Sequence, residues 1–167
     1  MAPSELDRTL LVLLRTRGHA RAAERLVAGY SRLGEHAACW LALGIGGALT
    51  GSAQRRGRWL RGTRVVAGAY GLNYGVKLAV RRPRPQLAGL PPLTDVVSGL
   101  SLPSAHATTS FAAARAYAGL APASLLYGAA AAFALSRPYL GVHYPSDVIL
   151  GAALGTVLAT LWPGAPR

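Results

Sequence analysis

Four long stretches of this 167-residue chain contain no Asp, Glu, Lys or Arg, and this absence of charge limits its fold more than any other feature. The stretches cover residues 37–54, 65–76, 116–136 and 148–166. Only 14% of all residues are charged, whereas about 25% is usual in a soluble domain. The pattern predicts a single all-α domain, an integral-membrane bundle of apolar helices.

Five membrane spans are expected from these stretches and from the turns between them. They cover residues 36–53, 64–80, 104–120, 122–136 and 145–162. Several are shorter than the roughly 20 residues of a straight bilayer crossing and are rich in Ala and Gly, so a soluble Ala-rich bundle stays open as the alternative. The domain is expected to divide into an N-terminal arm (1–34), a first span with a basic loop (35–64) and a helical core (65–162).

Small residues recur at four-residue spacing within these spans. The pairs are Gly47 and Gly51, Gly71 and Gly75, and Gly151 and Gly155. Such spacing lets helices pack closely in lipid, where the hydrophobic effect does not drive them together. The same faces could also join copies of the chain into a homo-oligomer.

The chain is strongly basic, with a net charge of +12. Most arginines lie in residues 8–32 and 55–64, where they flank apolar segments and do not alternate with aromatic residues. We therefore expect anionic membrane lipids as partners, and no nucleic acid. Cys39 is the single cysteine, so no disulfide can form within the chain.

The N-terminal arm has the pattern of a helix that lies in the plane of the membrane interface. Residues 5–30 are expected to form one amphipathic helix. Its apolar face would carry Leu6, Leu10, Leu13 and Leu14, while most of its arginines lie off that face.

Polar residues otherwise gather in three segments, 77–85, 103–106 and 136–147. The order of the five spans returns all three segments to the same face of the membrane. We therefore expect their side chains to converge. The roles of Arg81 and Arg82, both in the first segment, stay open between structure and function.

Three cations in these segments, Lys77, Arg84 and Arg137, suggest a site for an anion, because each guanidinium fork matches two phosphate oxygens. Ser104 is expected to cap the third span and Pro145 to begin the fifth. Two helix N-termini would then direct unpaired backbone N–H groups at one pocket. The combination is typical of a phosphate site, although a span-end lysine, an interfacial arginine or a capping serine also has a purely structural explanation.

Two histidines, His106 and His143, stand at the starts of these spans, and Asp147 lies four residues after His143. If the last helix extends back through Tyr144, the carboxylate reaches one imidazole nitrogen and fixes the tautomer. The other nitrogen is then free to attack phosphorus. His106 could protonate the leaving oxygen.

Together the three segments resemble the signature of the type 2 phosphatidic acid phosphatase superfamily. They read KLAVRRPRP at 77–85, PSAH at 103–106 and SRPYLGVHYPSD at 136–147. The one departure is Ala105, where that family most often has glycine; alanine still supplies a backbone N–H, so we expect a tighter fit around the phosphate and retained activity.

The resemblance implies a role for each matching residue. His143 would form a phosphohistidine, Asp147 would orient it, and His106 would protonate the leaving group. The phosphate oxygens would be held by Lys77, Arg84, Ser104 and Arg137. No cofactor and no metal ion are expected.

The function expected from this resemblance is hydrolysis of a lipid phosphate in the inner membrane of a bacterium. The two candidate substrates are decaprenyl-phosphoryl phosphoribose, which the compact chain slightly favours, and undecaprenyl diphosphate. Two other classes stay open. A vanadate-dependent haloperoxidase would use the same anion pocket, and a non-catalytic basic scaffold would only bind lipid.

Overall fold

The computed structural model describes residues 3–164, and within that range it has seven α-helices and no β-strand, which confirms the all-α prediction. The helices are α1 (Glu5–Thr16), α2 (Arg21–Leu33), α3 (Ala38–Thr50), α4 (Ala53–Val80), α5 (Ala105–Tyr117), α6 (Ala123–Tyr139) and α7 (Pro145–Leu161). A short 3-10 helix, η1 (Glu35–Ala37), joins α2 to α3. The five expected spans correspond to α3–α7. Among the described residues, no helix has both the length and the apolar character that a bilayer crossing requires.

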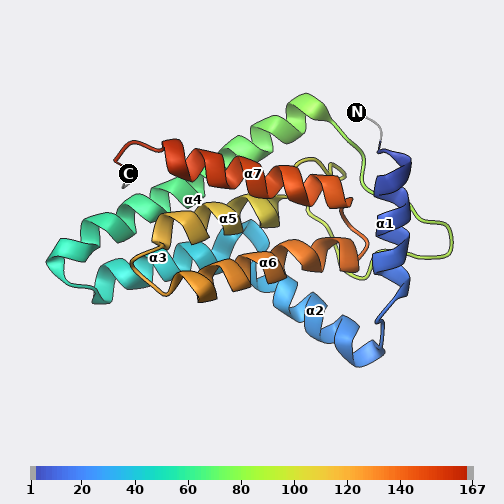
Figure 1. The fold of residues 1–167 in the computed structure, drawn as a ribbon, viewed down its shortest axis with the longest axis horizontal. Helices are drawn as coiled ribbons and strands as arrows, with labels where there is room; N and C mark the ends of the chain where they lie inside the picture. The colour runs from blue at the N-terminus through green and yellow to red at the C-terminus, as the bar shows by residue number, and fades with distance from the viewer. Residues whose placement is uncertain (1–2, 165–167) are drawn as a thin grey trace.

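Helix α5 lies in the middle of the bundle, surrounded by α3, α4, α6 and α7 (Figure 1). It can be central because most of its buried residues are small, mainly alanine, threonine and serine. Helix α7 also has small residues on the side that faces α5. A Cβ added to Gly155 would lie 2.0 Å from the carbonyl oxygen of Thr108. The expected close packing is therefore confirmed for α7, whereas Gly71 and Gly75 of α4 face open space.

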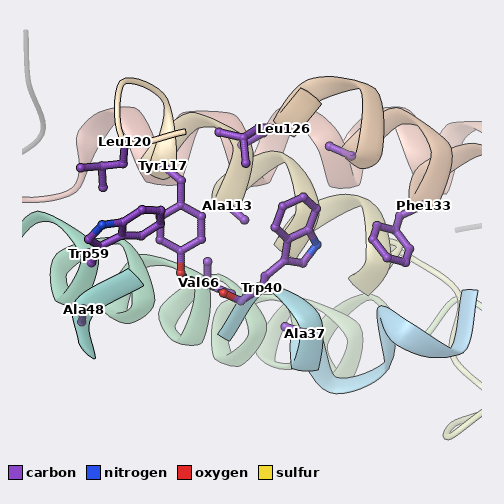
Figure 2. Close-up of a cluster of buried hydrophobic side chains, with 12 residues drawn as sticks. Ala37, Trp40, Ala48, Trp59, Val66, Ala113, Tyr117, Leu120, Leu126 and Phe133 are labelled. Atoms are coloured by element: carbon purple, nitrogen blue, oxygen red, sulfur yellow. Dashed lines mark hydrogen bonds between the residues drawn. The ribbon is translucent and has the colours of Figure 1, made fainter. Parts of the chain in front are cut away.

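Larger side chains fill the space between α3, α4, α5 and α6 (Figure 2). Trp40 and Tyr117 are buried there together with Trp59 and Phe133. Their polar ends are satisfied: Trp40 Nε1 donates to Ser110 Oγ at 2.8 Å, and the Tyr117 hydroxyl donates to the Trp40 carbonyl at 3.0 Å. The apolar core therefore lies in the body of the bundle, away from the end that α1 covers.

The prediction of one helix over residues 5–30 is wrong, because the arm contains two helices. The chain leaves α1 at Arg17 and turns at Gly18, whose φ of +72° is a conformation that glycine adopts without steric cost. The ring of His19 then stacks on Tyr139 of α6 with centroids 4.0 Å apart. This contact fixes the corner between the two helices.

Helix α1 lies across the end of the bundle opposite the C-terminus (Figure 1). The face that it buries carries Asp7, Leu11 and Arg15, at helical spacing of four residues. Leu6, Leu10, Leu13 and Leu14, the expected apolar face, all remain exposed. A face with two charged residues and Leu11 therefore docks α1, and the other four leucines point away from the protein.

The expected basic loop before residue 64 is wrong, because α4 begins at Ala53 and takes the basic segment 54–58 into its first turns. The arginines there bind carbonyl groups of neighbouring segments. Arg55 Nη2 donates to the Leu120 carbonyl at 2.8 Å, and Arg56 Nε donates to the Ala48 carbonyl at 3.1 Å. These contacts compensate for placing cations at a helix N-terminus, where the dipole disfavours them.

Candidate active site

A pocket at the end of the bundle is lined by side chains from several helices and from the loops between them. Lys77 comes from α4, Arg84 from the loop that follows, His106 from α5, Arg137 from the last turn of α6 and His143 from the loop before α7. Five of the seven predicted site residues thus lie together. The three polar segments converge, as the order of the spans predicts.

His143 is fully buried between a carboxylate and a cation. Its Nδ1 lies 3.4 Å from Asp147 Oδ2, and its Nε2 lies 3.1 Å from Arg84 Nη1. A guanidinium can only donate, so Nε2 carries the lone pair and Nδ1 carries the proton. Burial, and then the positive charges of Arg84, Arg137 and Lys77, lower the pKa of His143 well below its ordinary value. The imidazole is therefore neutral at pH 7, with the lone pair of Nε2 facing Arg84.

The route by which Asp147 reaches His143 differs from the expected one. Helix α7 begins at Pro145, and Tyr144 is extended (φ −74°, ψ 152°), so the helix does not extend back through Tyr144. Instead, Asp147 in the first turn accepts the Tyr144 backbone N–H at 2.8 Å. This capping bond folds the preceding loop over the helix and brings the His143 ring to the same carboxylate.

His106 is held by α2, an element that sequence reasoning did not connect with the site. Its Nε2 lies 2.9 Å from the backbone carbonyl of Ser31. A carbonyl only accepts, so Nε2 carries a proton, and in the neutral ring Nδ1 holds the lone pair. The Ser31 hydroxyl also accepts a hydrogen bond from Arg137 Nη1. No signal in the sequence marks Ser31, since its partners lie 75 and 106 residues away.

The three cations of the pocket are held by neutral groups rather than by carboxylates. Lys77 Nζ donates to the carbonyls of Leu100 and Ser101 at 2.9 and 3.1 Å. Arg84 donates to the Ser98 carbonyl at 2.6 Å and to the Val142 carbonyl. Burial lowers the pKa of Arg84 to about 10, which still leaves it charged at pH 7. Glu35 and Asp95 also line the pocket, but within the described residues neither forms an ion pair with these cations, so the cations are available to an anion.

Burial decides between the two explanations that the sequence left open for Lys77 and Arg137. Lys77 is 5% exposed and Arg137 is 4% exposed, so neither extends to a membrane interface. Arg137 Nε is buried without a hydrogen-bond partner. An unsatisfied charged donor beside a pocket is a place for an acceptor from outside the protein.

Comparison with known proteins identifies the family. A family model described as the PAP2 superfamily matches residues 63–166. This chain belongs to the PAP2 superfamily. It is therefore a phosphatase of the type that the three motifs indicate.

Curated relatives of this PAP2 protein cover most of its length. The decaprenylphosphoryl-5-phosphoribose phosphatase of Mycobacterium tuberculosis (strain H37Rv) is 39% identical over 133 residues, which are 80% of this chain and 75% of that protein. The protein of the same name from Mycolicibacterium smegmatis is 44% identical over 128 residues, which are 72% of this chain and 67% of the relative.

Solved structures show the same fold at low sequence identity. Aquifex aeolicus LpxE superposes with a TM-score of 0.75 at 19% identity, over 95% of this chain and 94% of that one. The first transmembrane PAP2 type phosphatidylglycerolphosphate phosphatase from Bacillus subtilis gives a TM-score of 0.73 at 22% identity, over 93% of this chain and 82% of that one.

The two remaining predicted site residues of this PAP2 phosphatase lie behind the pocket. Asp147 and Ser104 are both fully buried. Ser104 is the expected N-cap of α5, with its hydroxyl 3.5 Å from the Ala107 N–H. Ala105, the departure from the family pattern, lines the pocket, while a phosphate contact of Ser104 stays a prediction.

Arg82 belongs to the active site as well, although the sequence left its role open. It is 1% exposed, and its Nη1 donates to Asp147 Oδ1 at 2.8 Å. Its Nη2 donates to Asp7 Oδ2 of α1, also at 2.8 Å. Arg81, by contrast, is exposed and bonds only to its own helix.

Proposed function

We propose that this chain is a membrane phosphatase that hydrolyses a lipid phosphate through a phosphohistidine at His143. The observation that carries the proposal is the placement of His143 Nε2. Its lone pair is oriented by Asp147 on the far side of the ring and faces Arg84 at 3.1 Å. A phosphate bound by the cations would present phosphorus to that nitrogen.

The reaction has two steps that use the same groups in turn. In the first, which requires His106 to be protonated on both ring nitrogens, the His143 Nε2 lone pair forms a bond to phosphorus, the ester bond breaks, and the leaving oxygen takes the proton of His106 Nδ1. In the second, His106 Nδ1 accepts a proton from water, whose oxygen displaces His143 from phosphorus. Lys77, Arg84 and Arg137 stabilise the charge on the equatorial oxygens in both steps.

Apolar side chains on the outside of the bundle support a place in the membrane, with α3–α7 as its five spans. Large aliphatic residues of these helices point outward, and several are more than half exposed. They are Leu49, Leu125, Leu135, Ile149, Val157 and Leu161. The outward leucines of α1 fit an arm at the interface, as the N-terminal pattern predicts.

Decaprenyl-phosphoryl phosphoribose is the proposed substrate. The names of the mycobacterial relatives, which share 39–44% identity with this chain, support this choice over undecaprenyl diphosphate. Lipid phosphate release is measured with purified protein in detergent and excess chelator, because no metal requirement is expected. Phosphate release from the decaprenyl substrate above that from undecaprenyl diphosphate is the expected result. Bromination with bound vanadate, or no turnover of any lipid phosphate, would overturn the proposal.

The two histidines are separated by variants tested on two substrates. We expect His143→Ala to be inactive on both the lipid and a nitrophenyl ester, because no phosphoenzyme can form. We expect His106→Ala to lose the lipid activity and to keep part of the activity on the nitrophenyl ester, whose leaving group needs little protonation. The reverse result would exchange the two roles, and Gln86→Ala, at an exposed position that does not line the pocket, is the control.

A further inference from the structure

A buried chain of charges runs from the N-terminal arm to the nucleophile. Asp7 of α1 binds Arg82, Arg82 binds Asp147, and Asp147 faces His143. The two ion pairs are each 2.8 Å long, and Arg82 lies between them with 1% of its surface exposed. Asp7 is thus three contacts away from His143 and does not line the pocket.

The carboxylate of Asp7 is held at both oxygens. Oδ1 accepts the backbone N–H of Ser146 at 2.9 Å, and Oδ2 accepts the Ser146 hydroxyl in addition to Arg82. Burial by itself would raise the pKa of Asp7, but the hydrogen bonds from Ser146 and Arg82 lower it below its ordinary value. The group is therefore an anion at pH 7, bound to the residue that directly precedes Asp147.

Simple amphipathic docking does not explain why Asp7 is buried. Helix α1 keeps four leucines exposed and buries a face that begins with this carboxylate. Burying a charge is costly unless it is paired, and a paired buried charge contributes little net stability. The burial of Asp7 is better explained by its effect on the orientation of the Arg82 guanidinium.

We propose that Asp7 is a positioning residue for His143, acting through Arg82 and Asp147; this inference rests on the proposed phosphatase function. Each carboxylate takes one Nη of Arg82, so the guanidinium cannot turn its fork onto Asp147 alone. Oδ1 of Asp147 then accepts from Arg82, while Oδ2 accepts the Tyr144 N–H and faces Nδ1 of the His143 ring. Without Asp7, Arg82 is free to take both oxygens of Asp147, which would turn Oδ2 away from the ring.

The test compares Asp7→Asn with wild type and with Glu5→Gln, which changes an exposed carboxylate on the same helix. For Asp7→Asn we expect kcat to fall about tenfold on both the lipid and the nitrophenyl ester, with KM within about twofold. Glu5→Gln should match wild type. A loss confined to KM, or no loss at all, would overturn the proposal.

A double-mutant cycle distinguishes positioning of His143 from a purely structural role, in which Asp7 only holds α1 against the bundle. In an Asp147→Asn background, measured on the nitrophenyl ester, Asp7→Asn should cost less than about twofold, because its target is already gone. Equal factors in both backgrounds would show that Asp7 acts on stability alone. Arg82→Lys provides a second background. If Asp7→Asn does not fold, Ser146→Ala, which removes only the hydroxyl between the two charges, takes its place in the cycle.

The same assays separate this inference from the proposed function. If wild-type protein releases no phosphate, the phosphatase proposal fails. A different result overturns only the positioning role: wild-type protein releases phosphate, His143→Ala releases none, and Asp7→Asn releases it at the wild-type rate.

Discussion

Arg137 shows how the shape of a side chain, as well as its charge, contributes to the pocket. Its Nη1 donates to the Ser31 hydroxyl, while the buried Nε has no hydrogen-bond partner among residues 3–164. The sequence motif identified Arg137 correctly as a pocket residue. The motif could not identify Ser31, because a serine carbonyl has no distinguishing pattern and its contact depends on how α2 packs.

Replacing Arg137 by lysine tests the need for a planar fork. We expect Arg137→Lys to lose about 1–3 kcal/mol of transition-state stabilisation, because an ammonium cannot satisfy Ser31 and two phosphate oxygens at once. The measurement is kcat/KM for phosphate release. Arg81→Lys, an exposed arginine of α4's C-cap, is the matched control and should be unaffected. Wild-type kcat/KM in Arg137→Lys would show that charge alone is enough.

Among the helices, the boundaries that could be predicted are those that a capping serine or a proline marks in the sequence. Ser104, Pro122 and Pro145 mark the starts of α5, α6 and α7, and these helices begin within one residue of the expected positions. The start of α4 was missed although Gly51 and Ser52 precede it, because residues 54–58 were expected to form a basic turn. In the structure Arg55 and Arg56 bind carbonyl groups of neighbouring segments. The corner at Gly18 was missed because the apolar pattern continues across it.

The contact of α7 with α5 depends on glycine at position 155. We expect Gly155→Ala to lower the free energy of unfolding by about 1–3 kcal/mol, because the added methyl group meets backbone atoms of Thr108 and Ala112 within 3.0 Å. Thermal denaturation in detergent measures the change. Gly71→Ala, at a site with nothing within 4 Å, should be neutral or stabilising by up to about 1 kcal/mol. Equal destabilisation by both variants would contradict this packing.

For the whole molecule, the order of the helices was enough to predict that residues 77, 106 and 143 meet. It could not predict that the arm joins them. Asp7 lies 75 residues from Arg82 and 139 from Ser146, and its pattern in the sequence is that of an ordinary first-turn acid. Contacts of this kind depend on the docking angle of α1, which residue spacing does not specify.

Removing the arm tests how far activity depends on it. We expect a chain that lacks residues 1–34 to lose most phosphate release, although it retains every motif residue, because Arg82 and His106 each lose a partner. A separately expressed arm, added back, should restore part of the activity. Full turnover by the truncated chain would show that the arm only anchors the protein.

The crosswise docking of α1 also has a consequence for how proteins of this kind can diverge. The family match begins at residue 63, whereas the hydrogen-bond partners of Arg82 and His106 in the arm lie at residues 7 and 31. The arm and the core therefore cannot be exchanged between relatives as independent modules. A chimaera should work only when its arm brings an acid to meet Arg82, and substitutions at positions 7, 82 and 146 should be inherited as a set.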